Sequence, residues 1–192
     1  MPGRKASETE RREQILKAAH EVALRRGIDG LTVRAVAARA HLSHGLVLFH
    51  FKRKDQLGLA LLDRVLETTM SLRVPDDIGA IRNPRERLQA LFRHETHRLS
   101  REPRPIRLLL EYWARGTHNA VIRGKISAGL DRYRAVFQTM ADEAGAPDGV
   151  GAAVVSLIIG YPVQATIDPA QLDINDYLTS VEGIIGRRAT AA

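Results

Sequence analysis

The fold of this chain is decided by residues 31–51, which read LTVRAVAARAHLSHGLVLFHF. Thr32 and Ser43 are each placed to cap the start of a short helix, over residues 33–40 and about 44–50. Only two residues lie between the first helix and the cap of the second, so the two helices must cross at a steep angle. The segment therefore predicts a helix-turn-helix.

A longer helix is predicted before this unit, over about residues 8–26. Ser7 and Glu10 have the spacing of a capping box, and Gly27 offers the left-handed backbone at which a helix ends. Together the three helices form a small domain, which we predict to comprise residues 1–53.

Positive charge is concentrated in the same part of the chain. The sequence has 192 residues and a formal net charge of +7. Residues 1–57 contain 12 lysines and arginines against 6 acidic residues, whereas the remainder contains 17 against 16. Because contacts with phosphates supply most of the non-specific affinity of proteins for DNA, this distribution favours a DNA-binding head on a nearly neutral body. A solvated basic face is the alternative.

Several other classes of protein are disfavoured by the composition. The chain contains no cysteine, which excludes disulfides and cysteine-based zinc sites and suits a reducing cytoplasm. No apolar run reaches the ~18 residues that cross a bilayer, and Met1–Glu10 is polar, so we expect a cytoplasmic protein with no membrane partner. We find no nucleophile with its base and no phosphate loop, and His94 and His97 are one residue too close for the H-E-x-x-H motif. The sequence therefore predicts neither an enzyme nor a metal or other cofactor.

The N-terminal part resembles the DNA-binding domain of the tetracycline-repressor (TetR) family over about residues 8–57. The resemblance is carried by Leu31 to Ala37, Leu42 to Gly45, Phe51, Lys54 and Leu57. It implies an all-α homodimer in which a variable helical regulatory and dimerisation domain, here residues 54–192, binds a ligand and controls the head.

Two positions depart from the pattern of the family. His41 stands at the turn where the family usually has glycine, and Leu48 stands where it usually has a tyrosine that reaches the DNA backbone. We expect the turn to be retained, because histidine tolerates a positive φ better than most residues. The tyrosine contact must be absent, so another group has to position the third helix.

The third helix is expected to enter the major groove, where side chains near its N-terminal end face the base edges. We predict base contacts from Ser43, His44 and Leu46, of which Leu46 offers only an apolar contact such as one with a thymine methyl group. Gly45 is expected to let the helix approach the DNA backbone closely. The residues predicted to contact phosphates, in positions that the family commonly uses, are Thr32, Arg34, His50 and Lys54. For the histidines, a solvated or structural role is the alternative.

Two further expectations concern the flanks of this helix. Arg4 and Lys5 are expected to form an arm that reaches the DNA backbone or the minor groove. Phe49 and Phe51 are expected to pack in the core or at a hinge, because aromatic residues at the end of a short helix more often close a small domain than stack on bases.

The rest of the chain is predicted to be helical. A long helix runs from Asp55 until Pro75, a loop follows to Asn83, and Pro84 suits the start of the next helix. Residues 103–105 are expected to break the chain, and apolar residues at helical spacing predict further helices beyond them.

A ligand site is predicted within this body. Glu95 lies on the apolar stripe of the helix that starts at Pro84, and a carboxylate there costs energy unless it is paired or faces a polar cavity. Glu95 is therefore a candidate ligand-binding residue, with an arginine partner as the alternative. Trp113, Tyr133 and Phe137 are further candidates, as aromatic walls around a cation, with plain core packing as the alternative.

The last two predicted helices suggest how the chain dimerises. Residues 150–167 are apolar on nearly all sides, so their helix needs cover from its own core and from a partner, and the helix that begins at Ile174 offers a matching stripe. Two copies of each predict an isologous four-helix interface. The residues predicted for it are Val154, Leu157, Ile158, Tyr161, Tyr177, Val181 and Ile184. Pro162 is expected to kink the first of these helices. The run from Leu157 through Pro169 is similar to the C-terminal body of the betaine-pathway repressor branch, BetI.

These features predict a homodimeric transcriptional regulator with double-stranded DNA as its partner. We expect a repressor that leaves a palindromic operator when a small-molecule effector of unknown identity binds. The alternative is a DNA-binding regulator without a small-molecule effector, either constitutive or controlled by a protein partner.

Overall fold

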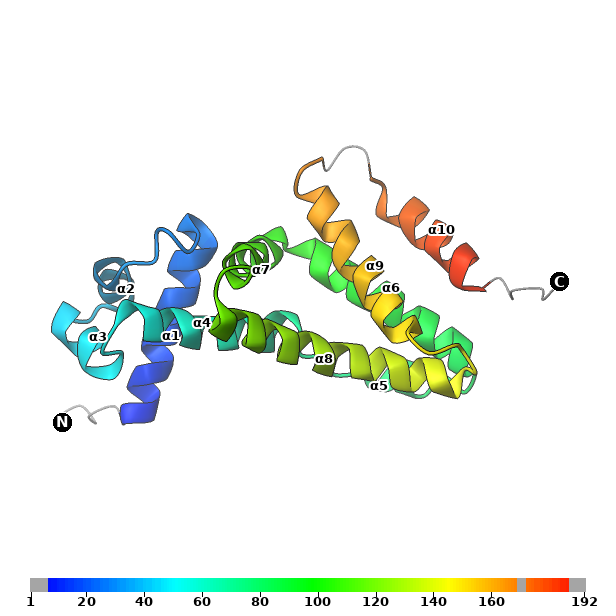
Figure 1. The fold of residues 1–192 in the computed structure, drawn as a ribbon, viewed down its shortest axis with the longest axis horizontal. Helices are drawn as coiled ribbons and strands as arrows, with labels where there is room; N and C mark the ends of the chain where they lie inside the picture. The colour runs from blue at the N-terminus through cyan, green and yellow to red at the C-terminus, as the bar shows by residue number, and fades with distance from the viewer. Residues whose placement is uncertain (1–6, 169–171, 187–192) are drawn as a thin grey trace. The chain divides into compact units, whose positions relative to one another are not determined.

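The structure, a computed structural model, describes residues 7–168 and 172–186. Over these ranges the protein is all-α, with ten helices and no strand (Figure 1). In chain order the helices are α1 (Glu8–Arg26), α2 (Val33–Ala40), α3 (His44–His50), α4 (Lys54–Thr69), α5 (Asp76–Gly79), α6 (Pro84–Arg101), α7 (Pro103–Gly116), α8 (Ala120–Glu143), α9 (Val150–Ala165) and α10 (Ile174–Gly186). No helix in the described ranges is both long and apolar enough to span a membrane.

The helices belong to two compact units. The first unit comprises the described parts of Met1–Met70 and Arg107–Gly129, and the second comprises those of Ser71–Ile106 and Leu130–Ala192. The first unit thus contains more than the DNA-binding domain predicted for residues 1–53, because it also holds α4, most of α7 and the start of α8.

Short-range polar contacts fix the ends of the first three helices. Ser7 and Glu10 form the predicted capping box: the Ser7 backbone N–H donates to Glu10 Oε2 at 2.7 Å, and the Glu10 N–H donates to Ser7 Oγ at 3.2 Å. The hydroxyls of Thr32 and Ser43 accept the N–H groups of residues 35 and 46 at 3.1 and 3.2 Å. The predicted bounds of α1, α2 and α3 are confirmed.

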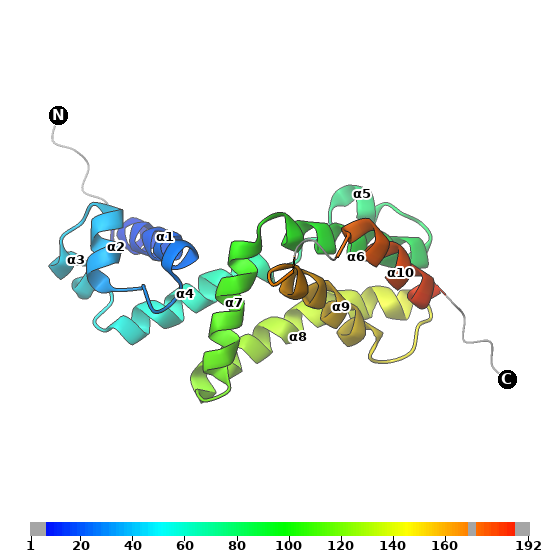
Figure 2. The ribbon, with the colours of Figure 1, turned by 90° about the horizontal axis from the view of Figure 1, so that it is seen from above.

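The core of the first unit lies where α1 contacts α2, α3 and α4 (Figure 2). The residues that supply it include Ile15, Ala19, Val36, Val47 and Leu61, each with no exposed surface. Burial of these apolar side chains stabilises the steep arrangement of the short helices, which could not persist alone in water.

Helix α7 is bound to the rest of the first unit at three points. The Glu111 carboxylate accepts the backbone N–H of Ile28 at 2.6 Å, just beyond α1. The Tyr112 hydroxyl donates to the carbonyl oxygen of Gly58 in α4 at 2.8 Å, and Arg115 forms an ion pair with Asp29. The C-terminal half of α7 is therefore fixed to both ends of the helix-turn-helix segment.

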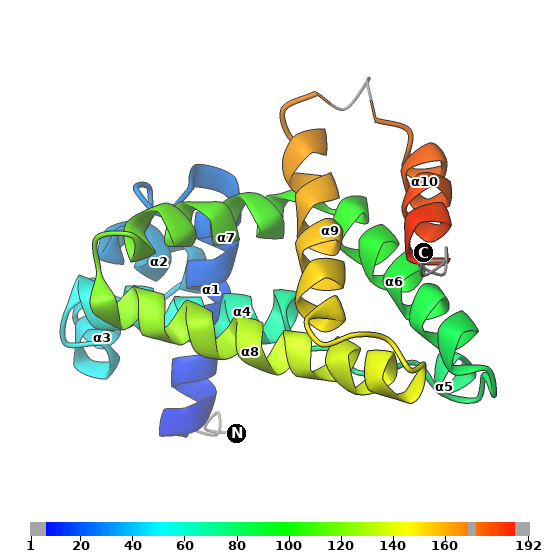
Figure 3. The ribbon, with the colours of Figure 1, turned by 45° about the vertical axis from the view of Figure 1, so that its right-hand side comes forward.

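The second unit is built around α6. Helices α9 and α10 both contact α6, as does the short α5 (Figure 3). The predicted apolar face of α6 is confirmed, because Leu88, Leu91, Phe92 and Leu99 are all buried. Pro162 lies inside α9 without ending it.

The helix that was expected to run from Asp55 until Pro75 is α4, which ends at Thr69. Two further helix bounds differ from the sequence prediction. The expected loop between Pro75 and Asn83 contains α5, and α7 begins at Pro103 although residues 103–105 were expected to break the chain. In the second case, both prolines lie in the first helical turn, where backbone N–H groups have no intrahelical partner and the fixed φ of proline suits the helix.

Candidate nucleic-acid interface and ligand site

The turn between α2 and α3 has the predicted conformation. His41 has φ 55° and ψ 42°, and it is the only non-glycine residue with positive φ in the described ranges. Its backbone N–H bonds back to the end of α2. The expectation that histidine replaces the usual glycine without loss of the turn is confirmed.

The N-terminal end of α3 is open to solvent. Ser43, His44 and Gly45 are exposed, while Leu46 is half-buried and Val47 faces the core. A Cβ added at Gly45 would have no atom within 4 Å, so the space in front of this position is open. The three predicted base-contacting side chains thus lie together at one helix end, where the N–H groups also favour an anion.

The predicted phosphate-contacting residues are accessible to different degrees. Thr32, Arg34 and Lys54 are exposed, whereas His50 is half-buried and its Nδ1 is buried without a hydrogen-bond partner among the described residues. Thr32 Oγ1 already accepts a backbone N–H as the cap of α2, yet its hydroxyl proton remains able to donate to a phosphate.

Phe49 and Phe51 differ, although both were expected to be packed. Phe51 is 2% exposed, which confirms the expectation, but Phe49 is 73% exposed and the expectation for it is wrong. Along a short helix only every third or fourth position faces the core, and here those positions are Val47 of α3 and Phe51 at its C-cap.

The predicted carboxylate of the body, Glu95, is buried and fully paired. It is 1% exposed, and its two oxygens accept Nε and Nη2 of Arg98 at 2.8 and 2.7 Å. The Tyr133 hydroxyl donates to Glu95 Oε2 at 2.6 Å, and His94 Nε2 lies 3.8 Å from Oε1. The arginine partner considered as the alternative is therefore present.

The protonation of these groups follows from their contacts. Burial raises the pKa of Tyr133, and the adjacent negative charge of Glu95 raises it further, so the phenol stays a hydrogen-bond donor. Burial alone would lower the pKa of Arg98, but its bonds with Glu95 outweigh burial and raise it. The cluster is a charged pair bound by a neutral phenol.

The structure brings together three of the four predicted ligand-binding residues. Phe137 has no exposed surface, and its ring centroid lies 5.5 Å from that of Tyr133 in an edge-on arrangement. Trp113 belongs to the first unit, is half-buried, and has an indole N–H that is buried without a hydrogen-bond partner in the described chain. The ligand-binding role of the four residues stays a prediction.

Comparison with known proteins identifies the family. Residues 15–61 match the sequence profile of bacterial regulatory proteins of the tetR family. The chain is 33% identical over 180 residues to an uncharacterized HTH-type transcriptional regulator in the dhlA 5' region of Xanthobacter autotrophicus, which covers 88% of this chain and 87% of that protein. The chain belongs to the TetR family. It is a DNA-binding transcriptional regulator of the helix-turn-helix type.

Two further proteins resemble this TetR-family chain. HTH-type transcriptional regulator BetI of Burkholderia ambifaria is 27% identical over 113 residues, which covers 59% of this chain and 58% of BetI. A transcriptional regulator from Saccharomonospora viridis, solved in complex with choline, superposes with a TM-score of 0.76 at 20% identity and covers 94% of this chain and 97% of its own. The structural likeness shows the shared fold.

In this TetR-family regulator, α3 is positioned by residues that the sequence did not single out. Nη1 of Arg12 donates to the carbonyl oxygen of His50 at 2.7 Å, and the guanidinium lies 4.3 Å from the ring centroid of Phe51. Gln14 Nε2 donates to the carbonyl oxygen of Ala40 at 2.9 Å. Both side chains project from α1, where exposed polar residues give no signal of a distant partner. These contacts hold the ends of α3 and α2 within the first unit.

The predicted dimer residues are partly covered by their own chain. Val154, Ile158, Tyr161 and Val181 are 0–6% exposed, so they contribute to the core of the second unit. Leu157 and Tyr177 are half-buried and joined by a hydrogen bond from the Tyr177 hydroxyl to the Leu157 carbonyl oxygen at 2.7 Å. The exposed side of α9 carries the small residues Ala152, Ala153 and Ser156.

Some predicted features cannot be placed. Arg4 and Lys5, expected to form an N-terminal arm, lie outside the described residues, and so does the side chain of Ile184 in the predicted dimer interface.

Proposed function

We propose that this regulator is a homodimeric repressor that is released from a palindromic operator by a small molecule. The observation that carries the proposal is the exposed N-terminal end of α3, because a recognition helix must leave such side chains free to read base edges. Ser43, His44 and Leu46 read bases, and Thr32, Arg34, His50 and Lys54 hold phosphates.

A protein that binds a palindromic operator needs two copies of its recognition helix, which a homodimer supplies. Two copies of α3 must lie about 34–36 Å apart to enter successive major grooves on one face of DNA. The small exposed residues of α9 support a helical interface, because small side chains allow two helices to approach closely.

Control by a small molecule is supported by a neighbour of the same fold. The Saccharomonospora viridis regulator was solved with choline, so a body of this architecture accommodates a small ligand. In this chain the Glu95 cluster of the second unit is the proposed regulatory site, and an effector acts by displacing Arg98 or Tyr133 from Glu95. A shift of a few kcal/mol between two conformations is enough to change operator affinity about tenfold to a hundredfold.

The complete pairing of Glu95 favours a second candidate function. Because both carboxylate oxygens are already bonded, the cluster can serve as a structural element of a regulator that has no small-molecule effector. Such a protein would be constitutive or controlled by a protein partner.

The proposal is tested by selecting bound fragments of genomic DNA with the full-length chain and measuring affinity for the recovered operator by fluorescence anisotropy. We expect Lys54→Ala to weaken binding to all duplexes alike and to reduce the slope of log affinity against log salt by about 1. His44→Ala should change the order of preference among operator variants, with about 1–3 kcal/mol at the affected base pair.

The matched control is Lys17→Ala, which removes an exposed lysine of α1 that is outside the proposed interface. Binding that survives both Lys54→Ala and His44→Ala unchanged would contradict the interface. An operator affinity that no metabolite in a broad screen alters would favour the effector-free candidate.

A further inference from the structure

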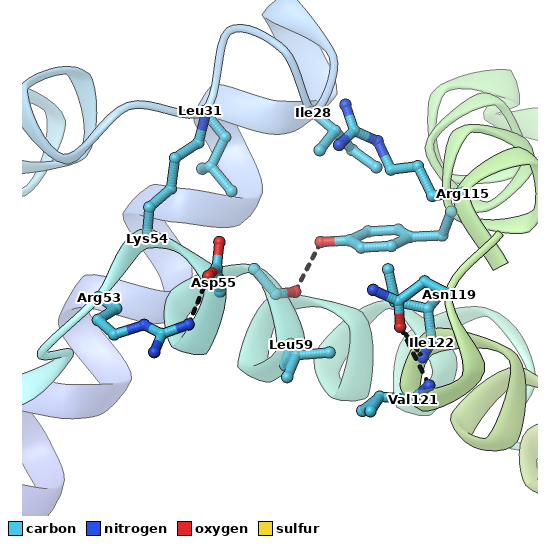
Figure 4. A pocket seen from close by; sticks show the side chains of 12 residues that line it. Ile28, Leu31, Arg53, Lys54, Asp55, Leu59, Arg115, Asn119, Val121 and Ile122 are labelled. Atoms are coloured by element: carbon cyan, nitrogen blue, oxygen red, sulfur yellow. Dashed lines mark hydrogen bonds and ion pairs between the residues drawn. The ribbon is translucent and has the colours of Figure 1, made fainter.

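The first unit contains a cavity that the proposed function does not use. Its volume is about 360 Å³, and its walls come from the segment after α1, the start of α4, the end of α7 and the start of α8 (Figure 4). All of the residues that line it belong to the first unit, whereas the Glu95 cluster belongs to the second.

One part of the cavity wall is apolar. Ile28, Leu31 and the ring of Tyr112 are buried in the unit, and Leu59 of α4 adds a half-buried side chain. Val121 also lines the cavity and is 57% exposed, which makes it one of three large hydrophobic residues that the described chain leaves in water. An apolar group in the cavity would remove this surface from solvent.

The charged groups on the other side of the cavity are not equivalent. Arg53 is paired with Asp55 at 2.8 Å, and Arg115 is paired with Asp29. Lys54 has no ion-pair partner in the described ranges, and Figure 4 shows it extending from the start of α4 toward Leu31. The wall therefore has one solvent-exposed lysine whose charge no ion pair in the described ranges offsets.

Asn119 adds a second donor. Its Oδ1 accepts the backbone N–H groups of Val121 and Ile122 at 3.0 and 3.1 Å, which orients the side chain at the start of α8. Its amide nitrogen is turned toward the cavity (Figure 4). The carboxylate of the wall, Asp55, is paired with Arg53 at 2.8 Å, so Lys54 and Asn119 are the donors that the wall offers to a ligand.

We propose that this cavity binds a small organic anion that has an apolar tail. The anionic group pairs with Lys54, while the tail packs on Ile28, Leu31 and Leu59. A cation is disfavoured because it would meet the positive charge of Lys54, and a wholly apolar ligand would lack the charge-assisted contact that an anion makes there.

Occupancy of the cavity has a consequence for DNA. Lys54 is also a proposed phosphate contact, so an anion bound to it removes one cation from the interface and lowers the affinity for DNA. This consequence rests on the proposed function, whereas binding of the anion does not.

The experiment measures binding to the full-length chain by isothermal titration calorimetry in the absence of DNA. Octanoate is the probe, with octylammonium as its cationic counterpart and octanol as its neutral one, each at the same ionic strength. We expect octanoate to bind at one site per chain and at least about tenfold more tightly than either comparison compound. A tenfold difference in affinity corresponds to one charge-assisted contact with Lys54.

Two variants locate the site. Gly58→Leu places a side chain in the cavity from α4 and should abolish octanoate binding. The variant is expected to fold, because an added Cβ meets no atom within 4 Å and leucine is a better helix former than glycine. Lys54→Gln should weaken it about tenfold or more. Lys52→Gln is the matched control, because it removes a neighbouring exposed lysine that does not line the cavity, and it should bind octanoate like the parent.

Three results would overturn the proposal: no octanoate binding, equal binding of octylammonium, or binding that Gly58→Leu leaves intact. The DNA consequence is measured separately by anisotropy with a random-sequence duplex. Saturating octanoate should lower that affinity more than the same concentration of chloride does, and an unchanged affinity would overturn the competition for Lys54.

Discussion

In the head, formed by α1–α3, the polar side chains that shape the helices act over three residues of sequence, as Ser7 with Glu10 shows. In the second unit, the polar contact of Tyr133 with Glu95 joins residues 38 positions apart. No charged side chain is buried among the described residues of the head, whereas the second unit buries the carboxylate of Glu95 and must pair it. Burial, rather than the sequence separation of the partners, distinguishes the polar contacts of the two regions, since Arg12 of the head also reaches the carbonyl oxygen of His50, 38 positions away.

The largest test of this comparison is Glu95→Gln. Removal of the buried charge replaces two charge-assisted bonds with Arg98 by neutral ones, so we expect the free energy of unfolding to fall by about 2–3 kcal/mol. Urea denaturation measures it. As a control, Glu102→Gln breaks an exposed pair with Arg104 and should change stability little. Equal effects of the two changes would contradict the importance of burial.

Gly27→Ala tests the junction at which the head meets α7. Gly27 has φ 68° and ψ −179°, a region nearly restricted to glycine, and an added Cβ would lie 2.9 Å from Glu111 Oε1. We expect a loss of about 2 kcal/mol in thermal or urea unfolding, because strain is added and the Glu111 bond to Ile28 is disturbed. The same change at Gly124, which has open space in α8, should instead stabilise by about 0.5–1 kcal/mol. A neutral result at Gly27 would show that the α7 contact contributes little.

His41→Val tests whether the local conformation of the turn is decisive for the head. A β-branched residue is disfavoured at positive φ, so we expect a loss of about 1–2 kcal/mol and weaker operator binding. His41→Gly is the control and should retain both stability and binding, since glycine adopts this conformation freely. If the His41→Val and His41→Gly variants were equally stable and bound the operator equally well, the role assigned to the turn would be refuted.

The smallest expected effect concerns His20, a titratable group inside the head. Burial, and then the charge of Arg64, lowers the pKa of His20, so the folded protein binds this proton less readily than the unfolded chain. The stability that comes from this lowered pKa is therefore fully present above the ordinary histidine pKa of about 6.5 and is lost as the pH falls below it. Because the site is partly exposed, the free energy of unfolding should fall by less than about 1 kcal/mol. Urea unfolding between pH 7.5 and 5 should show a shallower decline for His20→Asn than for the same change at exposed His118. If the stability of the two variants declined equally with pH, His20 would make no contribution to the pH dependence of the head.

Much of the head was predictable because its determinants are close together in sequence. The caps at Ser7, Thr32 and Ser43 and the turn at His41 act on backbone groups two to four residues away, so their spacing alone defines the helices. The partners of Arg12 and Gln14 were not predictable, because a polar residue on an exposed helix face carries no record of which distant carbonyl it meets. Phe49 was misplaced for a related reason: the burial of an aromatic depends on which face of the helix the core already occupies.

By itself, the sequence determined that this chain is an all-α protein with a basic helix-turn-helix head, since periodicity, capping and charge are properties of neighbouring residues. Only the tertiary structure decided that the Glu95–Arg98 pair of α6 meets Tyr133 of α8, and that Lys54 lines a cavity with residues of α7 and α8. Both outcomes depend on side chains from separate helices, and the energy of a buried or uncompensated charge is set by the groups that folding brings within a few ångströms.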